Sequence, residues 1–154
     1  MTSDSIIKNF EEIRRKSIKL WSGLPPEYYH WRPDTKAMTC IEMIRHVLET
    51  EHIYHVIIKN RGGHGDKDTV WAGRPYTTIQ NELDFAEPFR KDFAATILSF
   101  SENDLAAINI VRQGRITRSL RDFLLRCNYH ESVHAGQFLS YLRTLGLVRP
   151  NIWD

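Results

Sequence analysis

Apolar residues recur every three or four positions in four separate stretches of the chain, the spacing that places them on one face of an α-helix. The first stretch shows this spacing at Ile6, Phe10, Ile13, Leu20 and Trp21. It predicts a helix over roughly 4–22, which ends at the glycine and two prolines of 23–26.

The second helix is predicted to begin at a pair of side chains that can cap it. Thr39 is followed three residues later by Glu42, so the hydroxyl and the carboxylate can each accept a free backbone N–H, as in a capping box. This pattern predicts a helix over roughly 39–60. Four glycines and a proline then fall within 61–76, which predicts a long loop.

The third and fourth helices show similar starting signals. Thr77 and Gln80 repeat the capping-box spacing and predict a helix that continues to about residue 100. Ser119 and Asp122 predict the start of the fourth helix, which extends to a stop at Gly146.

Four amphipathic helices without a strand-rich segment predict an all-α protein, a four-helix bundle formed by one domain over 1–154. The stretch 101–117 is interpreted as an irregular break between helices. The loop of ~16 residues at 61–76 can span roughly 50 Å when extended, more than a helix of about 22 residues at roughly 33 Å. It is therefore long enough to cross over the bundle.

Composition excludes several classes of protein. The chain has 21 Lys and Arg against 19 Asp and Glu, and a formal net charge of +2 is too small to attract nucleic acid or a membrane surface in general. No apolar run approaches the ~18 residues of a membrane span, and no signal-peptide pattern opens the chain. Cys40 and Cys127 are too isolated for a disulfide framework. We expect a soluble, cytoplasmic protein with reduced thiols.

Three histidines fall within the predicted apolar faces. His130 and His134 are four residues apart in the stripe of the fourth helix, and His46 lies in that of the second. Burying three imidazoles costs several kcal/mol unless each finds a partner. One metal ion would satisfy all three, so the pattern predicts a metal site assembled across the bundle. Three hydrogen-bonded core histidines are the alternative.

The segment HESVHAGQ, which starts at His130, also contains the H-E-x-x-H spacing of zinc metalloproteases. Such enzymes take their third ligand from downstream. The 20 residues after His134 contain neither His nor Glu, so the protease interpretation fails. Glu131 is still a candidate catalytic base for a metal-bound water, with a hydrogen-bond acceptor or an exposed helix position as alternatives.

Two segments combine a turn or a helix start with histidines further along the same helix. In HWRPDTKAMTCIEMIRHVLETE a W-R-P turn leads into a capped helix bearing one histidine, and in ITRSLRDFLLRCNYHESVHAGQFLSYLRTLG a T-x-x-L-R-D-type start leads to H-x-x-x-H-x-G-Q. With these two segments the chain resembles the DinB/YfiT-like metalloenzyme family. The resemblance implies an up-down-down-up bundle with nickel or zinc on His46, His130 and His134. It also implies a low-molecular-weight thiol cosubstrate, as in the family's bacillithiol-type transferases and mycothiol-dependent isomerases.

For several other polar side chains a role outside the metal site is the favoured interpretation. His52 and His55 are expected near an exposed shoulder of the second helix, as solvated side chains. Cys127 is interpreted as a small buried residue. Five arginines before and along the start of the fourth helix either receive the carboxylates of a cosubstrate or form a solvated face: Arg112, Arg115, Arg118, Arg121 and Arg126.

Two classes of function follow from these features. The first is a divalent-metal-dependent transferase or hydrolase acting on a small molecule, with a thiol cosubstrate as one option. The second is a non-catalytic metal- or ligand-binding bundle, such as a stress-related dimer, in which the metal braces the helices. No nucleic-acid or membrane partner is predicted, and a homodimer fits both classes. The open metal positions are expected to face a pocket rimmed by Trp31, Trp71 and Trp153.

Overall fold

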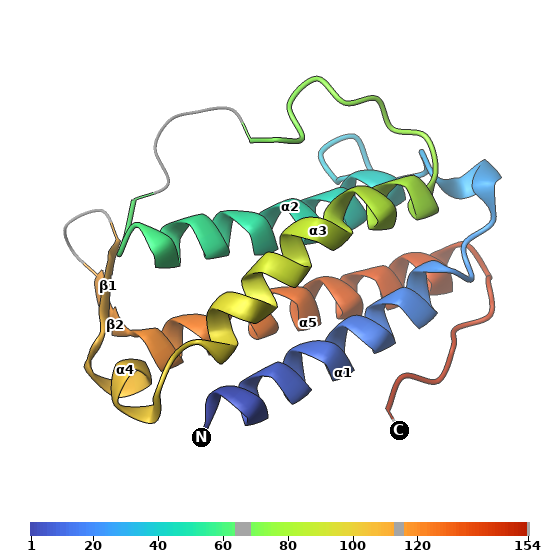
Figure 1. Ribbon diagram of the computed structural model, residues 1–154. Helices are drawn as coiled ribbons and strands as arrows, with labels where there is room; N and C mark the ends of the chain where they lie inside the picture. Colours follow the sequence, from blue (N-terminus) through green and yellow to red (C-terminus); the bar gives the residue numbers. More distant parts are fainter. Residues whose placement is uncertain (64–68, 113–115, 154) are drawn as a thin grey trace.

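Four long helices form the bundle in the computed structural model, which describes residues 1–63, 69–112 and 116–153 (Figure 1). The long helices are α1 Ser3–Trp21, α2 Cys40–Lys59, α3 Ile79–Leu98 and α5 Leu120–Thr144. The shorter elements are the 3-10 helix η1 Pro26–Tyr28, helix α4 Glu102–Ala107, and strands β1 Asn109–Arg112 and β2 Ile116–Ser119. The all-α class predicted from the sequence is confirmed.

The order of helix directions is up, down, down, up. In Figure 1, α2 and α3 run the same way, and α1 and α5 run the opposite way. Because α2 ends and α3 begins at opposite ends of the bundle, the connection between them crosses over, as the resemblance implied.

Helix starts agree with the capping signals, with one shift. The Thr39 backbone N–H donates to Glu42 Oε2 at 2.7 Å, and the Glu42 N–H donates to Thr39 Oγ1 at 3.3 Å. The side chain of Ser119 caps α5 as predicted. Helix α3 starts one residue later than expected, because the capping side chain is Thr78, which accepts from the Asn81 N–H at 3.1 Å.

The segment interpreted as an irregular break holds regular structure. Ser101 caps α4 through a capping box, and β1 and β2 pair as an antiparallel hairpin with a fully buried Ile110. The hairpin docks on the end of α2, where the Val111 N–H donates to the Arg61 carbonyl at 3.1 Å. The position after Arg61 must be glycine, because a Cβ on Gly62 would lie 1.9 Å from the Val111 carbonyl oxygen. Strands of four residues are too short to show a clear alternating pattern.

Buried apolar side chains form two clusters, one toward each end of the bundle. Along every long helix a charged residue stands between the parts that enter the two clusters. These four residues, which we call the charged layer, are Arg14 of α1, Glu51 of α2, Arg90 of α3 and Glu131 of α5.

Candidate metal centre

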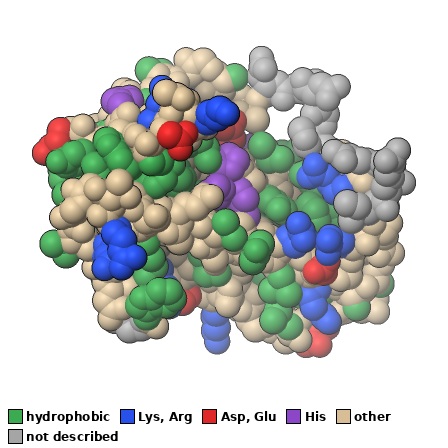
Figure 2. Space-filling view, turned by 180° about the vertical axis from the view of Figure 1, so that it is seen from behind, with side chains coloured by type: hydrophobic (Ala, Val, Ile, Leu, Met, Phe, Trp, Pro, Cys, Tyr) green, Lys and Arg blue, Asp and Glu red, His purple; other side chains and the backbone are tan. Residues whose placement is uncertain are grey.

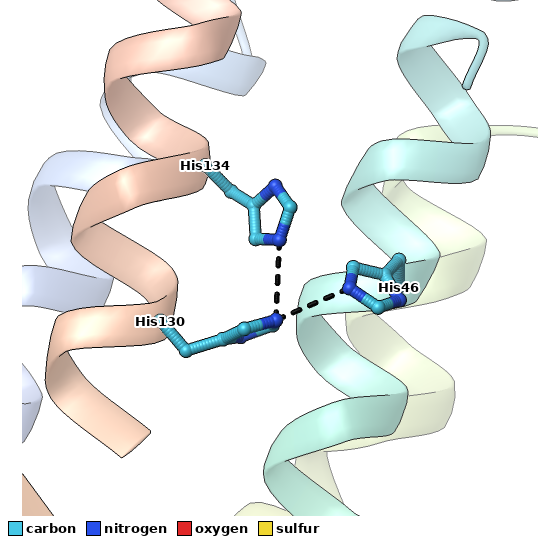
Figure 3. A group of neighbouring side chains, drawn as sticks. All are labelled: His46, His130 and His134. Atoms are coloured by element: carbon cyan, nitrogen blue, oxygen red, sulfur yellow. Dashed lines mark hydrogen bonds between the residues drawn. The ribbon is translucent and has the colours of Figure 1, made fainter. Parts of the chain in front are cut away.

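The three histidines predicted as ligands meet between α2 and α5. His130 and His134 are four residues apart on α5, so both rings project from one face of that helix. His46 reaches them from the second turn of α2. Figure 3 shows the three rings turned toward one another, and all three side chains are half-buried.

The spacing of the ring nitrogens suits a metal ion. His130 Nε2 lies 3.1 Å from His46 Nε2 and 3.1 Å from His134 Nε2. One nitrogen from each ring lies within 4.8 Å of the others. Two imidazoles bound to one ion at bonds of about 2.0–2.1 Å have their nitrogens roughly 2.9–3.4 Å apart, so the two short separations fit a shared ion.

Hydrogen bonding among neutral rings does not satisfy this arrangement. The Nε2 atom of a neutral histidine has either one proton or one lone pair. His130 Nε2 therefore makes one good hydrogen bond at most, although it has two close nitrogen neighbours. A cation can accept a lone pair from each of the three rings. The three nitrogens therefore suit a bound metal ion better than they suit hydrogen bonds to one another.

The imidazoles are held in the neutral form that a metal requires. Burial lowers the pKa of His46 and of His134 below the ordinary 6.5. For His130 burial acts first, the neighbouring rings of His134 and His46 add to it, and the pKa falls to about 4. At neutral pH each ring therefore has one unprotonated nitrogen whose lone pair can bind a metal ion.

Gln137 orients one of the rings, a role that the sequence interpretation missed. Its side-chain oxygen lies 2.7 Å from His134 Nδ1, and an amide oxygen can only accept, so the proton of the ring is on Nδ1. The Nε2 lone pair of His134 then points to the cluster. The signal in the sequence was the glutamine one helical turn after a candidate ligand.

Glu131 is held in the charged layer rather than beside the histidine nitrogens. Its two carboxylate oxygens accept from Arg14 Nε at 2.8 Å and from Arg14 Nη2 at 3.0 Å, and it is 7% exposed. Burial acts to raise the pKa of this carboxyl, but the Arg14 guanidinium outweighs burial and holds the pKa below 4.5. The ion pair gives Glu131 a structural partner, and its role as a catalytic base stays a prediction.

The expectation for the other two histidines of α2 was wrong. His55 is 2% exposed, its Nε2 lies 2.9 Å from Thr96 Oγ1, and its ring stacks on Phe93. His52 is half-buried against Trp71. Both belong to the packing of α2 against α3 and the crossover, because the helix turns this face toward neighbours that its local sequence does not reveal.

Among the candidate arginines, Arg118 forms a 2.7 Å ion pair with Asp122 on the protein surface, in line with the solvated-face alternative. Arg115 lies outside the described residues. Cys127 is a buried free thiol, as interpreted, and burial raises its pKa well above the ordinary value.

One cavity adjoins the histidine cluster at His46, and a second cavity lies next to the first. The first, of about 360 Å³, has His46 on its wall and is bounded by the loop 32–38. The second, of about 530 Å³, is lined by Trp71 and the residues that follow it in the crossover. Figure 2 shows histidine side chains near the middle of this face, with basic and acidic side chains above them.

None of the three tryptophans expected at the rim lines the cavity beside His46. Trp71 lines the second cavity instead. Trp31 packs edge-on against Tyr141, next to the loop that bounds the first cavity. Trp153 is 84% exposed and lines neither cavity.

A four-helix bundle with a three-histidine cluster shared by two of its helices defines the class of protein. The chain belongs to the DinB superfamily, whose sequence model matches residues 9–138. The uncharacterized protein YjoA of Bacillus subtilis (strain 168) is 19% identical over 156 residues, which cover 94% of this chain and 91% of YjoA.

The fold also matches a solved structure. A crystal structure of a DinB-like protein, YjoA from Bacillus subtilis, superposes with a TM-score of 0.72 and 20% sequence identity, and the match covers 96% of each chain. Family and fold are therefore confirmed. Within the described ranges, no helix is both long enough and apolar enough to cross a membrane.

Proposed function

We propose that the chain is a divalent-metal-dependent enzyme, a transferase or hydrolase acting on a small molecule, with nickel or zinc bound by His46, His130 and His134. The observation that carries the proposal is the convergence of three neutral imidazoles, one of which, that of His46, lines a cavity. Family membership supports it. A low-molecular-weight thiol is the proposed cosubstrate, and the cytoplasm, where thiols stay reduced, is the proposed location.

The chain's own residues would divide the work at this site. The three histidines hold the ion, and Gln137 fixes the tautomer of His134. When bound, a divalent ion on three neutral ligands can lower the pKa of a bound water to about 7 or stabilise a thiolate. The cavity beside His46 would admit a small molecule next to this histidine.

The first experiment is a metal analysis of protein purified without added metal, followed by titration with nickel and with zinc. His46→Ala should lose most of the bound metal, because one of three ligands is removed. His30→Ala is the matched control, since His30 is exposed in a loop and should keep full occupancy. Full metal retention in His46→Ala would contradict a site shared by α2 and α5.

A second experiment separates the enzyme from a non-catalytic bundle braced by its metal. The site joins α2 to α5, so a bound ion would also strengthen the contact between these helices. Consumption of small thiols by the metal-loaded protein, lost in His130→Ala, supports the enzyme. Metal-dependent stability without turnover of any thiol or ester supports the brace, including the alternative of a stress-related homodimer.

A further inference from the structure

Glu49 stands beside the histidine cluster and has no part in the function described so far. It follows His46 by three residues on α2, so the two side chains lie on the same face of the helix. Glu49 lines both cavities, whereas His46 lines the first alone. A molecule that approaches His46 from the cavity therefore meets the Glu49 carboxylate.

The described residues orient the carboxylate of Glu49 without neutralising its charge. The Thr69 hydroxyl of the crossover donates a hydrogen bond to Oε1 of Glu49. Among the described residues, no Lys, Arg or His lies within ion-pair distance of this carboxylate, and its second oxygen accepts no hydrogen bond. The side chain is half-buried, so this oxygen is available to a ligand in the cavity.

The other buried or cavity-lining carboxylates of α2 and α5 are already engaged. Glu131 and Glu51 belong to the charged layer and bind Arg14. Glu42 lines the first cavity, but its Oε2 accepts the Thr39 N–H in the helix cap. Glu49 is therefore the carboxylate best placed to act on a ligand next to His46.

The charged environment of Glu49 is mixed. Arg45 also lines both cavities, but its guanidinium is taken by Glu82 of α3 and by two carbonyls of the crossover. The remaining charged or titratable side chains of the first cavity are Arg32, Lys36, Glu42, His46 and Tyr76. The negative charge of Glu49 also acts on His52, three residues further along α2.

We propose that Glu49 is the acid–base residue of the site, which takes the proton of a small neutral ligand carrying an S–H or O–H group as that ligand binds beside His46. This inference rests on the proposed metal-dependent function. The donor–H bond breaks with both electrons left on the sulfur or oxygen, and the proton passes to a Glu49 carboxylate oxygen. Glu49 then returns the proton to the product or to water. The carboxylate is not within the group of nitrogens that lie 4.8 Å or less apart, so it acts on the ligand and not as a fourth metal ligand.

The test measures how fast a thiol binds. Nickel-loaded protein is mixed with 2-mercaptoethanol at about pH 7.5, where a thiol is mostly protonated, and formation of the nickel–thiolate complex is followed by its absorbance in a stopped-flow instrument. Glu49→Gln retains the hydrogen bond to Thr69 but cannot take a proton, so thiol binding should slow by about 100-fold, the lower end of what a positioned base contributes. Glu42→Gln is the matched control and should behave as wild type, since glutamine also serves at this capping position.

Azide serves as a second probe because it binds metals as an anion and brings no proton. It should bind the nickel-loaded Glu49→Gln variant at least as tightly as wild type, because a negative charge has been removed nearby. Thiol binding at equal rates in wild type and Glu49→Gln would overturn the role of Glu49, as would azide binding without thiol binding. Failure to bind nickel at all would instead overturn the proposed metal site.

Discussion

Removing Arg14 should show how much the charged layer contributes to stability. Arg14 is 4% exposed, makes two hydrogen bonds to Glu131 and lies 3.1 Å from Glu51. In Arg14→Met the methionine side chain fills the space of the aliphatic part of the arginine. Glu51 keeps Arg90 as an ion-pair partner, whereas Glu131 loses the cation that it binds. Breaking a buried pair from one side costs about 3–5 kcal/mol, so we expect a loss of that size at pH 7.

The loss should depend on pH with a defined sign. In wild type the folded-state pKa of Glu131 lies below 4.5, so its ion pair contributes stability above that pH and loses it as the pH falls. Without Arg14, burial is left to raise the pKa, and the carboxyl takes up a proton more readily. The difference between wild type and Arg14→Met should therefore shrink between pH 7 and pH 4.

Urea unfolding followed by circular dichroism measures both effects. The double variant Arg14→Met, Glu131→Met should recover most of the lost stability, because neither buried charge is then left without its partner. Arg15→Met is the control on the exposed side of α1 and should change little, since its pair with Glu12 is on the surface. A loss below about 1 kcal/mol for Arg14→Met would refute the reasoning that Glu131 depends on this cation.

Three further results are expected. Nickel or zinc at about 100 times the dissociation constant should raise the free energy of unfolding by about 2.7 kcal/mol, and His130→Ala should abolish the rise in a melting experiment. Gln137→Leu should weaken metal binding by about 10–100-fold in calorimetry while Gln137→Glu retains it, because glutamate also accepts from Nδ1 of His134; equal affinities would exclude the orienting role. Burial lowers the pKa of His55 from 6.5 to about 4, so the neutral ring contributes stability that is lost as the pH falls below about 6.5. His55→Phe should lose less stability than wild type between pH 7 and pH 5, and an identical loss would contradict this.

Local sequence patterns predicted the helices but not which residues of different helices contact one another. Thr39 with Glu42, and the four-residue step from His130 to His134, carry their meaning within one or two turns, so the cap and the shared face were predicted correctly. The partner of Glu131 is Arg14, 117 positions away, and no local pattern identifies it.

The same limit explains the error for His55. A histidine on the edge of an apolar stripe is equally compatible with solvent or with a neighbouring helix. Here α3 supplies Phe93 for stacking and Thr96 for a hydrogen bond, and both come from about 40 residues later in the chain. The hairpin was missed because β1 and β2 have four residues each, too few for their alternation to stand out.

The charged layer fixes the positions of the four helices along their axes relative to one another. Apolar side chains tolerate sliding, but a helix that moved by one turn, about 5.4 Å, would carry its charge away from its partners and into an apolar cluster. Glu131 is the immediate neighbour of His130, and Glu51 lies five residues after His46 on the same helix. The ion pairs of Glu51 and Glu131 thus set the heights at which the imidazoles of α2 and α5 meet, so a change in the layer should alter metal affinity without replacing a ligand.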